Sequence, residues 1–277
     1  MNLFEQTIKK AIEYNKNYSS LRTVVEKEVM HHDILREMNK AGYLKNLTFI
    51  GGTCLRLCYG SERLSEDLDF ASSFEFNKKN LADLPQILRD SFLKKYNFKV
   101  EVSEPVKEAG DTNTWKIKII TRQDKKNLPI QRINLDIVLL PSHNRQPIMI
   151  KNYYGIDNGI SGLILFAESL EEILVDKIIA VAFRLNRVKN RDLWDIFWIS
   201  RKNINLDKEL LKQKLSDRKI DYKDFLTKYN NRIKEIENSQ QIFLDEMKRF
   251  LAPSAFDNTF TSTLWWQQLI LVLKNIL

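Results

Sequence analysis

The spacing of apolar residues changes twice along this chain. Up to Gly42 they recur every three or four positions, which predicts two N-terminal helices, the second ending at that glycine. Between residues 47 and 140, short apolar and alternating runs predict strands, interrupted by a helix over 81–96. From Ser169 onward the period is again helical. The pattern predicts an α+β core preceded by helices and followed by a C-terminal helical bundle.

Five segments have the length and composition of strands, which predicts a mixed sheet of about five strands. They are 47–50, 68–71, 98–102, 115–121 and 132–140. In the fourth, apolar Trp115 and Ile117 alternate with Lys116 and Lys118, as in a sheet with one wet face. Residues 53–59 fit a short buried helix between the first two strands.

The turn-rich segment 152–162 holds three glycines and marks the expected domain boundary. We therefore expect a core domain over 1–155, which includes the N-terminal helices, and a helical domain over 156–277.

Composition narrows the class of protein. With 43% hydrophobic and 29% charged residues, wholesale disorder is excluded. The first residues form no secretory signal, and the most apolar stretch, 264–273, is too short to cross a bilayer, so we expect a docked terminal helix and no membrane partner.

The two thiols, Cys54 and Cys58, cannot by themselves form a structural zinc site and indicate buried packing; a cytoplasmic location follows as the default. The net charge of +8 is compatible with a nucleotide or nucleic-acid partner without requiring one.

Paired carboxylates are the main candidate for chemistry. Asp67 and Asp69 stand two apart in a predicted strand, so both leave the same face of the sheet. Their mutual repulsion favours a cation between them, with Mg²⁺ or Mn²⁺ and substrate phosphates as the usual solution. Asp136 lies among Leu135 and Ile137 in a strand expected to be buried, which makes it the candidate third metal ligand. An internal ion pair is the alternative for Asp136.

The turn Gly51-Gly52-Thr53 joins a strand to a helix, where free backbone N–H groups can bind an anion. The same turn also arises for packing reasons, so alone it is a weak indication. Arg63 and Ser65 precede the two aspartates and are in reach of the same phosphates.

The helical half carries a second cluster. Lys177 and Arg184 are seven apart and share a helix face. Residues 184–191 hold four basic side chains and no acid, as in a groove for a triphosphate or an RNA backbone, or in a solvated helix end. Arg191 and Asp195, at i,i+4, are alternatively a surface pair.

Three motifs, in order between about residue 45 and residue 200, make the chain recognisable. Residues 51–57 with 63–70, residues 176–184, and the R-D-x-x-D pattern at 191–197 resemble the motifs of the AbiEii/AbiGii-type nucleotidyltransferases. These are toxins of type IV toxin–antitoxin and abortive-infection systems. The N-terminal helices and the chain after about residue 205 lie outside these motifs. Leu64 stands where an aromatic residue is frequent in the family, a small departure.

The resemblance implies a DNA polymerase β-like nucleotidyltransferase core and transfer of a nucleoside monophosphate from an NTP, with release of pyrophosphate. Relatives bind GTP or add pyrimidine nucleotides to the 3′ ends of tRNA, which implies an RNA acceptor and a cognate antitoxin. By motif position, Asp67 and Asp69 are metal ligands, Ser65 supplies a hydroxyl, Lys177 contacts the triphosphate and Asp195 is an acid of the helical domain. The assignment of Asp136 rests on strand position alone.

In the resulting hypothesis, Asp136 completes a second metal site, and Arg184 and Arg191 help Lys177 neutralise the leaving pyrophosphate. Three alternatives share parts of this site: a metal-dependent nuclease, a small-molecule nucleotidyltransferase and a non-catalytic nucleotide-binding module. The sequence leaves the NTP and the acceptor undetermined.

Overall fold

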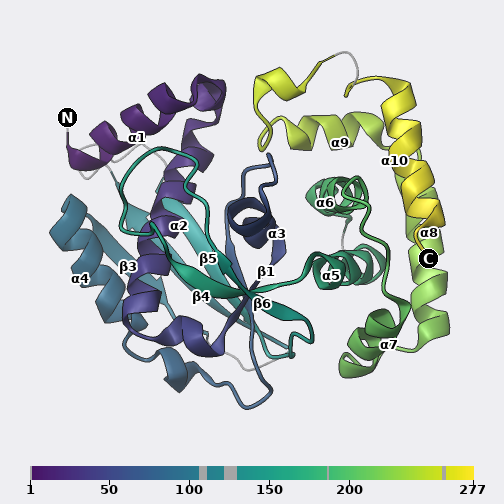
Figure 1. Cartoon of the computed structure of the whole chain (residues 1–277), viewed down its shortest axis with the longest axis horizontal. Helices are drawn as coiled ribbons and strands as arrows, with labels where there is room; N and C mark the ends of the chain where they lie inside the picture. Colours follow the sequence, from purple (N-terminus) through teal and green to yellow (C-terminus); the bar gives the residue numbers. More distant parts are fainter. Residues whose placement is uncertain (1, 106–110, 122–129, 186, 258–259) are drawn as a thin grey trace. The chain divides into compact units, whose positions relative to one another are not determined.

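The computed structural model describes residues 2–105, 111–121, 130–185, 187–257 and 260–277 (Figure 1). The chain divides into two compact units, Met1–Ala167 and Glu168–Leu277. This division falls later than the expected boundary at 155, because residues 164–168 form a strand of the sheet.

The first unit combines the N-terminal helices with the sheet. Its helices are α1 (Leu3–Tyr14), α2 (Arg22–Lys40), α3 (Gly51–Cys54) and α4 (Leu84–Tyr96), with the short helical segments η1 (Lys16–Leu21), η2 (Tyr43–Asn46), η3 (Leu55–Tyr59) and η4 (Lys78–Leu81). Its strands are β1 (Thr48–Ile50), β2 (Leu68–Ala71), β3 (Lys99–Ser103), β4 (Thr112–Ile120), β5 (Gln131–Val138), β6 (Arg145–Met149) and β7 (Ile164–Glu168).

The α+β class is confirmed, with helices before and after a mixed sheet. The described strands form one sheet of seven in the order β3-β4-β5-β2-β1-β7-β6, whereas the sequence predicted about five. The two additional strands are β6 and β7. β6 is mostly exposed and contains Pro147, so it lacks the alternation that predicts a strand. β7 is a short apolar run next to the helical half of the chain, and periodicity alone does not distinguish such a run from a helix segment.

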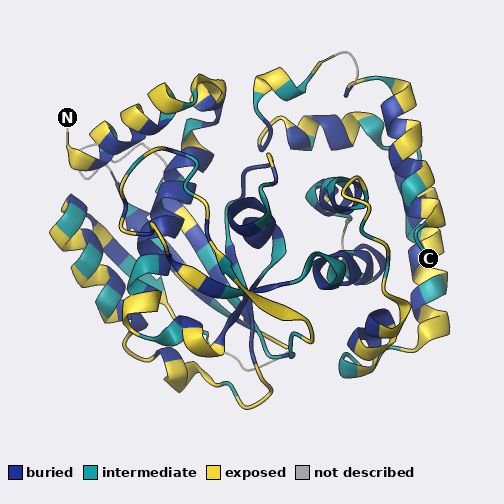
Figure 2. Cartoon of the chain, viewed as in Figure 1, coloured by how far each residue is buried: buried dark blue, intermediate teal, exposed yellow. Residues whose placement is uncertain are grey.

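The two faces of the sheet follow the alternation in β4. Trp115, Ile117 and Ile119 are buried, while Lys116 is exposed and Lys118 is half-buried. On the covered side, α2 packs against β5 and α4 against β3. Most of α2 is buried (Figure 2), including several charged residues. The expected wet face of the sheet is therefore present, on the side opposite the apolar core.

The second unit is helical, as predicted. It contains α5 (Leu170–Phe183), α6 (Asn190–Ser200), α7 (Lys208–Asp217), α8 (Tyr222–Ile236), α9 (Gln240–Met247), η5 (Pro253–Ala255) and α10 (Thr263–Asn275). Ser169 caps α5 by accepting the N–H of Glu172 at 3.2 Å. α5 is its central helix and packs against α6, α7 and α8.

The apolar C-terminal stretch forms α10, which packs against α6 and α8 as a docked terminal helix. Trp265 is its anchor: its ring lies 4.8 Å from Phe197 and 4.6 Å from Phe260, in edge-on contacts. No helix in the described part of the chain has both the length and the apolarity needed to cross a membrane.

Candidate active site

The candidate carboxylates lie on two neighbouring parallel strands. Asp69 of β2 and Asp136 of β5 are direct register partners, and both are half-buried on the same face of the sheet. Asp67, just before β2 begins, accepts the backbone N–H of Asn134 through Oδ1 at 3.1 Å. Parallel neighbours stand about 4.8 Å apart, so Asp69 and Asp136 are close enough to share a ligand.

Asp136 is not as buried as its apolar neighbours suggested. β5 alternates, so Leu135 and Ile137 enter the core while Asp136 faces the wet side. Its Oδ1 accepts a hydrogen bond of 2.6 Å from the hydroxyl of Thr114, its register partner on β4. The hydroxyl orients the carboxylate without neutralising its charge.

The donor set fits a metal that is completed by substrate. Among the described residues, no group of three His, Cys, Asp or Glu side chains is placed to hold a metal ion. Mg²⁺ is commonly bound by one or two carboxylates together with waters and substrate phosphates rather than by a full set of protein ligands. The neighbouring acids Asp69 and Asp136 match that arrangement.

Gly51 brings the turn against the carboxylates. Its φ of +74° favours glycine, and a Cβ at this position would lie 2.7 Å from Oδ2 of Asp69. Gly52 makes room for the protein's own side chains, because a Cβ there would collide with the guanidinium of Arg63 and lie 3.2 Å from the hydroxyl of Ser65. The glycine pair therefore has one member beside the carboxylates and one that serves packing.

The other predicted phosphate contacts are buried and engaged within the protein. The hydroxyl of Thr53 donates to the backbone carbonyl of Asp67. Arg63 donates to the carbonyl of Leu64 at 2.9 Å, and it is only 2% exposed. Ser65 is 5% exposed. These contacts tie the glycine turn to the strand that carries Asp67 and Asp69. Roles in nucleotide binding stay predictions for Gly51, Gly52, Thr53, Arg63 and Ser65.

A buried acid of α2 holds the same loop from the other side, and sequence reasoning missed it. Glu28 is 1% exposed and accepts the backbone N–H of Ser65 at 3.0 Å and Nε of Arg56 at 3.3 Å. The hydroxyl of Tyr154 donates to the same carboxylate. Although burial opposes it, Glu28 together with neighbouring tyrosines raises the pKa of Arg56. The signal available in the sequence was a charge on an apolar stripe, since Glu28 follows Val24 and Val25 at helical spacing.

Glu66, between Ser65 and Asp67, is also held by α2. Its carboxylate pairs with Lys27 at 2.8 Å, and its carbonyl lies 3.0 Å from Nε2 of His31. Three positions of α2 thus contact the two residues that precede the D-x-D pair.

In the helical unit, Lys177 of α5 and Arg184, the residue directly after α5, contact acids of α6. Nζ of Lys177 lies 2.7 Å from Asp192 and 2.9 Å from Asp195, and Nη2 of Arg184 lies 2.9 Å from Asp192. The predicted common helix face does not include Arg184, because α5 ends at Phe183 and Arg184 is its C-cap residue in an extended conformation. Both cations nevertheless contact the R-D-x-x-D motif. Asp195 is fully buried, so the alternative of a surface pair with Arg191 is wrong.

Arg191 is directed at a different helix. Its Nε lies 3.9 Å from Oε1 of Glu246, and its guanidinium is stacked 4.6 Å from the ring centroid of Phe250. A stacked guanidinium with a carboxylate neighbour packs α6 against α9. Its predicted contact with phosphate remains a prediction.

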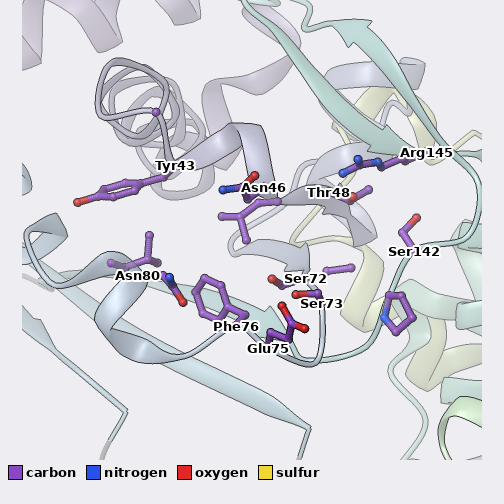
Figure 3. A pocket seen from close by; sticks show the side chains of 15 residues that line it. Tyr43, Asn46, Thr48, Ser72, Ser73, Glu75, Phe76, Asn80, Ser142 and Arg145 are labelled. Carbon is purple, nitrogen blue, oxygen red and sulfur yellow. The ribbon is translucent and has the colours of Figure 1, made fainter.

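A cavity of about 530 Å³ lies at the end of β1 and β2 that is opposite to the carboxylates. Figure 3 shows the side chains that line it. Thr48, Ala71 and Ser72 line it where β1 begins and β2 ends, together with Phe76 and Arg145. It contains none of the predicted site residues. The carboxylates instead stand on the open face of the sheet.

The family follows from a comparison with known proteins. A family model described as the nucleotidyl transferase AbiEii toxin of type IV toxin–antitoxin systems matches residues 33–262. The chain belongs to the AbiEii family. It is therefore a nucleotidyltransferase of a toxin family, and an NTP is its substrate class. No curated protein sequence matches the chain. The AbiEii match begins within α2, so Lys27, Glu28 and His31 precede it.

Solved structures support the fold of this AbiEii chain. The nucleotidyltransferase toxin MenT4 of Mycobacterium tuberculosis has a TM-score of 0.62 and 12% identity, over 97% of this chain and 88% of MenT4. JHP933 of Helicobacter pylori has a TM-score of 0.51 and 17% identity, over 90% of this chain and 91% of the JHP933 chain. At these identities the likeness extends to the arrangement of the chain and not to its substrates.

Proposed function

We propose that this AbiEii protein transfers a nucleoside monophosphate from an NTP to RNA, with a tRNA 3′ end as the acceptor, and that it depends on a divalent metal. The observation that carries the proposal is the side-by-side placement of Asp69 and Asp136, with Gly51 packed against the first. We further propose that a cognate antitoxin controls it, as the type IV family implies, and that it acts in the cytoplasm.

Asp69 and Asp136 would hold Mg²⁺ or Mn²⁺ together with substrate phosphates. Asp67, whose Oδ1 accepts the backbone N–H of Asn134, stays a predicted ligand that joins them only when the substrate binds. When bound, such an ion balances the charge of the triphosphate and lowers the pKa of the acceptor hydroxyl. The acceptor oxygen then bonds to the α-phosphorus as the bond to the bridging oxygen breaks; pyrophosphate leaves and the hydroxyl proton passes to solvent.

The protein's own contribution is to hold these acids in place. Thr53 fixes the backbone at Asp67, Gly51 leaves room for the carboxylate of Asp69, and Thr114 orients Asp136. A preorganised acid pair needs little rearrangement when the triphosphate binds.

For the helical unit we propose that Lys177 contacts the triphosphate and that Asp195 holds its ammonium group. Asp195 is buried beside Nζ, while the Lys177 side chain keeps 13% exposure. Arg184 and Arg191 remain the predicted partners of the leaving pyrophosphate.

The test is incubation with each radiolabelled NTP, Mg²⁺ and total cellular RNA, followed by gel analysis. Label should enter RNA with the wild-type protein, and EDTA should abolish the transfer. Asp67→Ala and Asp136→Asn should lose transfer by at least a hundredfold. Asp90→Ala, which removes an exposed acid of α4, is the matched control and should retain it. Wild-type transfer by Asp67→Ala would overturn the assignment.

The same assay separates the alternatives. A nuclease shortens the RNA without NTP, whereas a transferase needs NTP and releases pyrophosphate. A small-molecule nucleotidyltransferase leaves RNA unlabelled but consumes NTP with another acceptor. A binding module retains NTP without turnover, and its expression is harmless to cells.

A further inference from the structure

We propose that the open face of the sheet beside the carboxylates binds the phosphate backbone of the acceptor strand, through Lys116, Lys118 and Arg132. We call these three residues the basic face. The proposal rests on the proposed function in one respect only, namely that the acceptor is a nucleic acid.

The register of the strands places the basic face next to the acids. In the β4–β5 pair, Thr114 stands opposite Asp136, and two residues further along Lys116 stands opposite Asn134. Two residues further again, Lys118 stands opposite Arg132. Every second residue of a strand leaves the same face, so all of these side chains share the face of Asp69 and Asp136. β4 and β5 are adjacent in Figure 1.

The reach of the basic face matches a chain-like ligand. Two residues of an antiparallel strand span about 7 Å, so the cations stand about 7 Å and about 14 Å along the sheet from the row that holds Asp136. A small acceptor at the carboxylates, such as a nucleoside or an antibiotic, carries no negative charge that could reach these cations. A single-stranded nucleic acid has phosphates along its length and needs cations spaced in this way.

The charge balance of this region is positive. Lys116 and Arg132 are exposed. Lys118 lies 2.9 Å from Glu101 of β3, which also pairs with Lys99 at 3.4 Å. Lys118 and Glu101 keep 37% and 43% exposure, so water screens this pair and the lysine remains accessible. Apart from Asp136, this face of β3, β4 and β5 therefore carries one acid, Glu101, and four cations: Lys99, Lys116, Lys118 and Arg132.

Protection of a sheet edge does not account for these cations. Lysines on edge strands commonly prevent unwanted pairing between sheets. β4 and β5 are interior strands of this sheet, with β3 at its edge. Attraction for a polyanion explains a cationic row on interior strands.

The test compares a triple variant, Lys116→Gln with Lys118→Gln and Arg132→Gln, with a matched control in the same unit. The control is Lys10→Gln with Arg89→Gln and Lys94→Gln, which are exposed on α1 and α4. Binding of a fluorescent single-stranded RNA is measured by anisotropy at salt concentrations from about 50 to about 300 mM. The slope of log K against log salt reports the number of phosphate contacts, because each contact releases counterions. Unchanged melting temperatures establish that both variants are folded.

We expect the triple variant to bind RNA at least tenfold more weakly, with a slope of log K against log salt that is shallower by about 2, since each lost single-strand phosphate contact removes about 0.7. The control variant should match the wild type in both. In the transfer assay the triple variant should raise KM for RNA and leave KM for NTP unchanged. The single variants Lys116→Gln and Arg132→Gln should each show part of the loss.

Wild-type RNA affinity and salt slope in the triple variant would overturn the proposal, as would an equal loss in the control or no RNA binding by the wild-type protein. Loss of binding to phosphatidylserine vesicles with RNA binding unchanged would assign the face to a membrane and also overturn it. If the triple variant loses RNA binding but the wild-type protein transfers no nucleotide to RNA, the basic face stands and the proposed function fails.

Discussion

Gly51 and Asp69 occupy adjacent space: a Cβ on residue 51 would lie 2.7 Å from Oδ2 of the carboxylate. Gly51 is the first residue of α3, directly after the end of β1, and Asp69 lies in β2, where its register partner is Ile50. The glycine thus lets the strand–helix turn approach the acid without displacing it.

Substituting Gly51 by alanine should damage the site more than the fold. A left-handed backbone costs a non-glycine residue about 1–2 kcal/mol, and the added methyl group must also displace Asp69. Gly42→Ala is the matched control, because its φ of +78° is similar and nothing lies within 4 Å of its Cβ position. Urea unfolding should show a similar loss of stability for both variants, whereas nucleotide transfer should fall at least tenfold further for Gly51→Ala. Equal transfer by the two variants would show that the contact with Asp69 has no effect.

Loss of Glu28 should destabilise the first unit strongly. Glu28→Ala leaves the buried guanidinium of Arg56 and the N–H of Ser65 without their acceptor, and breaking a buried ion pair costs about 3–5 kcal/mol. Glu28→Gln keeps the shape and one acceptor oxygen, so its loss should be smaller. Glu13→Ala removes an exposed partner of Lys9 and should change the free energy of unfolding by less than about 0.5 kcal/mol. Chemical denaturation measures all three, and similar values for Glu28→Ala and Glu13→Ala would contradict the role of Glu28.

Stability should fall in acid because of two buried histidines on α2. Burial lowers the pKa of His31 to about 4 and that of His32 to about 3. In the unfolded chain both protonate as the pH falls through about 6.5, so the unfolded state binds more protons between that value and about 4. Their contribution, on the order of 3 kcal/mol each, is therefore complete above pH 6.5 and is lost as the pH falls towards 4.

His32→Leu tests this directly. Neither ring nitrogen of His32 has a hydrogen-bond partner within the described residues, so an apolar side chain of similar size should be tolerated. Urea midpoints measured from pH 7.5 to 4.5 should decline less steeply for His32→Leu than for the wild type. His143→Gln, at an exposed position, should follow the wild-type curve. A wild-type slope in His32→Leu would refute the assignment.

Lys177 should prove structural as well as functional. Lys177→Ala leaves Asp195 fully buried next to Asp192, and we expect a loss of about 3–5 kcal/mol in the stability of the helical unit. Combining it with Asp195→Asn should recover part of that stability, because it removes one of the two buried carboxylate charges that Nζ of Lys177 balances. Transfer activity should not recover with stability if Lys177 contacts the triphosphate. Activity that follows stability in the double variant would limit Lys177 to a structural role.

Local patterns carried much of this protein. The alternation around Trp115 and the run at 68–71 predicted strands that formed within a few residues of the expected bounds, since a side chain's direction in a strand depends only on its position along it. The seven-residue spacing of Lys177 and Arg184 predicted one helix face, but α5 ends at Phe183, so only Lys177 lies on the helix. The three motifs in order sufficed for the family, because each consists of short stretches of the chain that can be read without the fold.

Contacts between residues far apart in the sequence could not be predicted from these local patterns. The sequence pointed to Gly52 as a place of close approach, but only the folded chain determined that Arg63 and Ser65 fill that space. It gave no indication that Glu28 holds Ser65, or that Asp192 lies between Lys177 and Arg184. The parallel pairing of β7 with β1 was likewise decided only in the folded chain. The periodicity of a segment is a property of its own residues, whereas the partner of a buried charge or an edge strand is chosen by the packing of the whole unit.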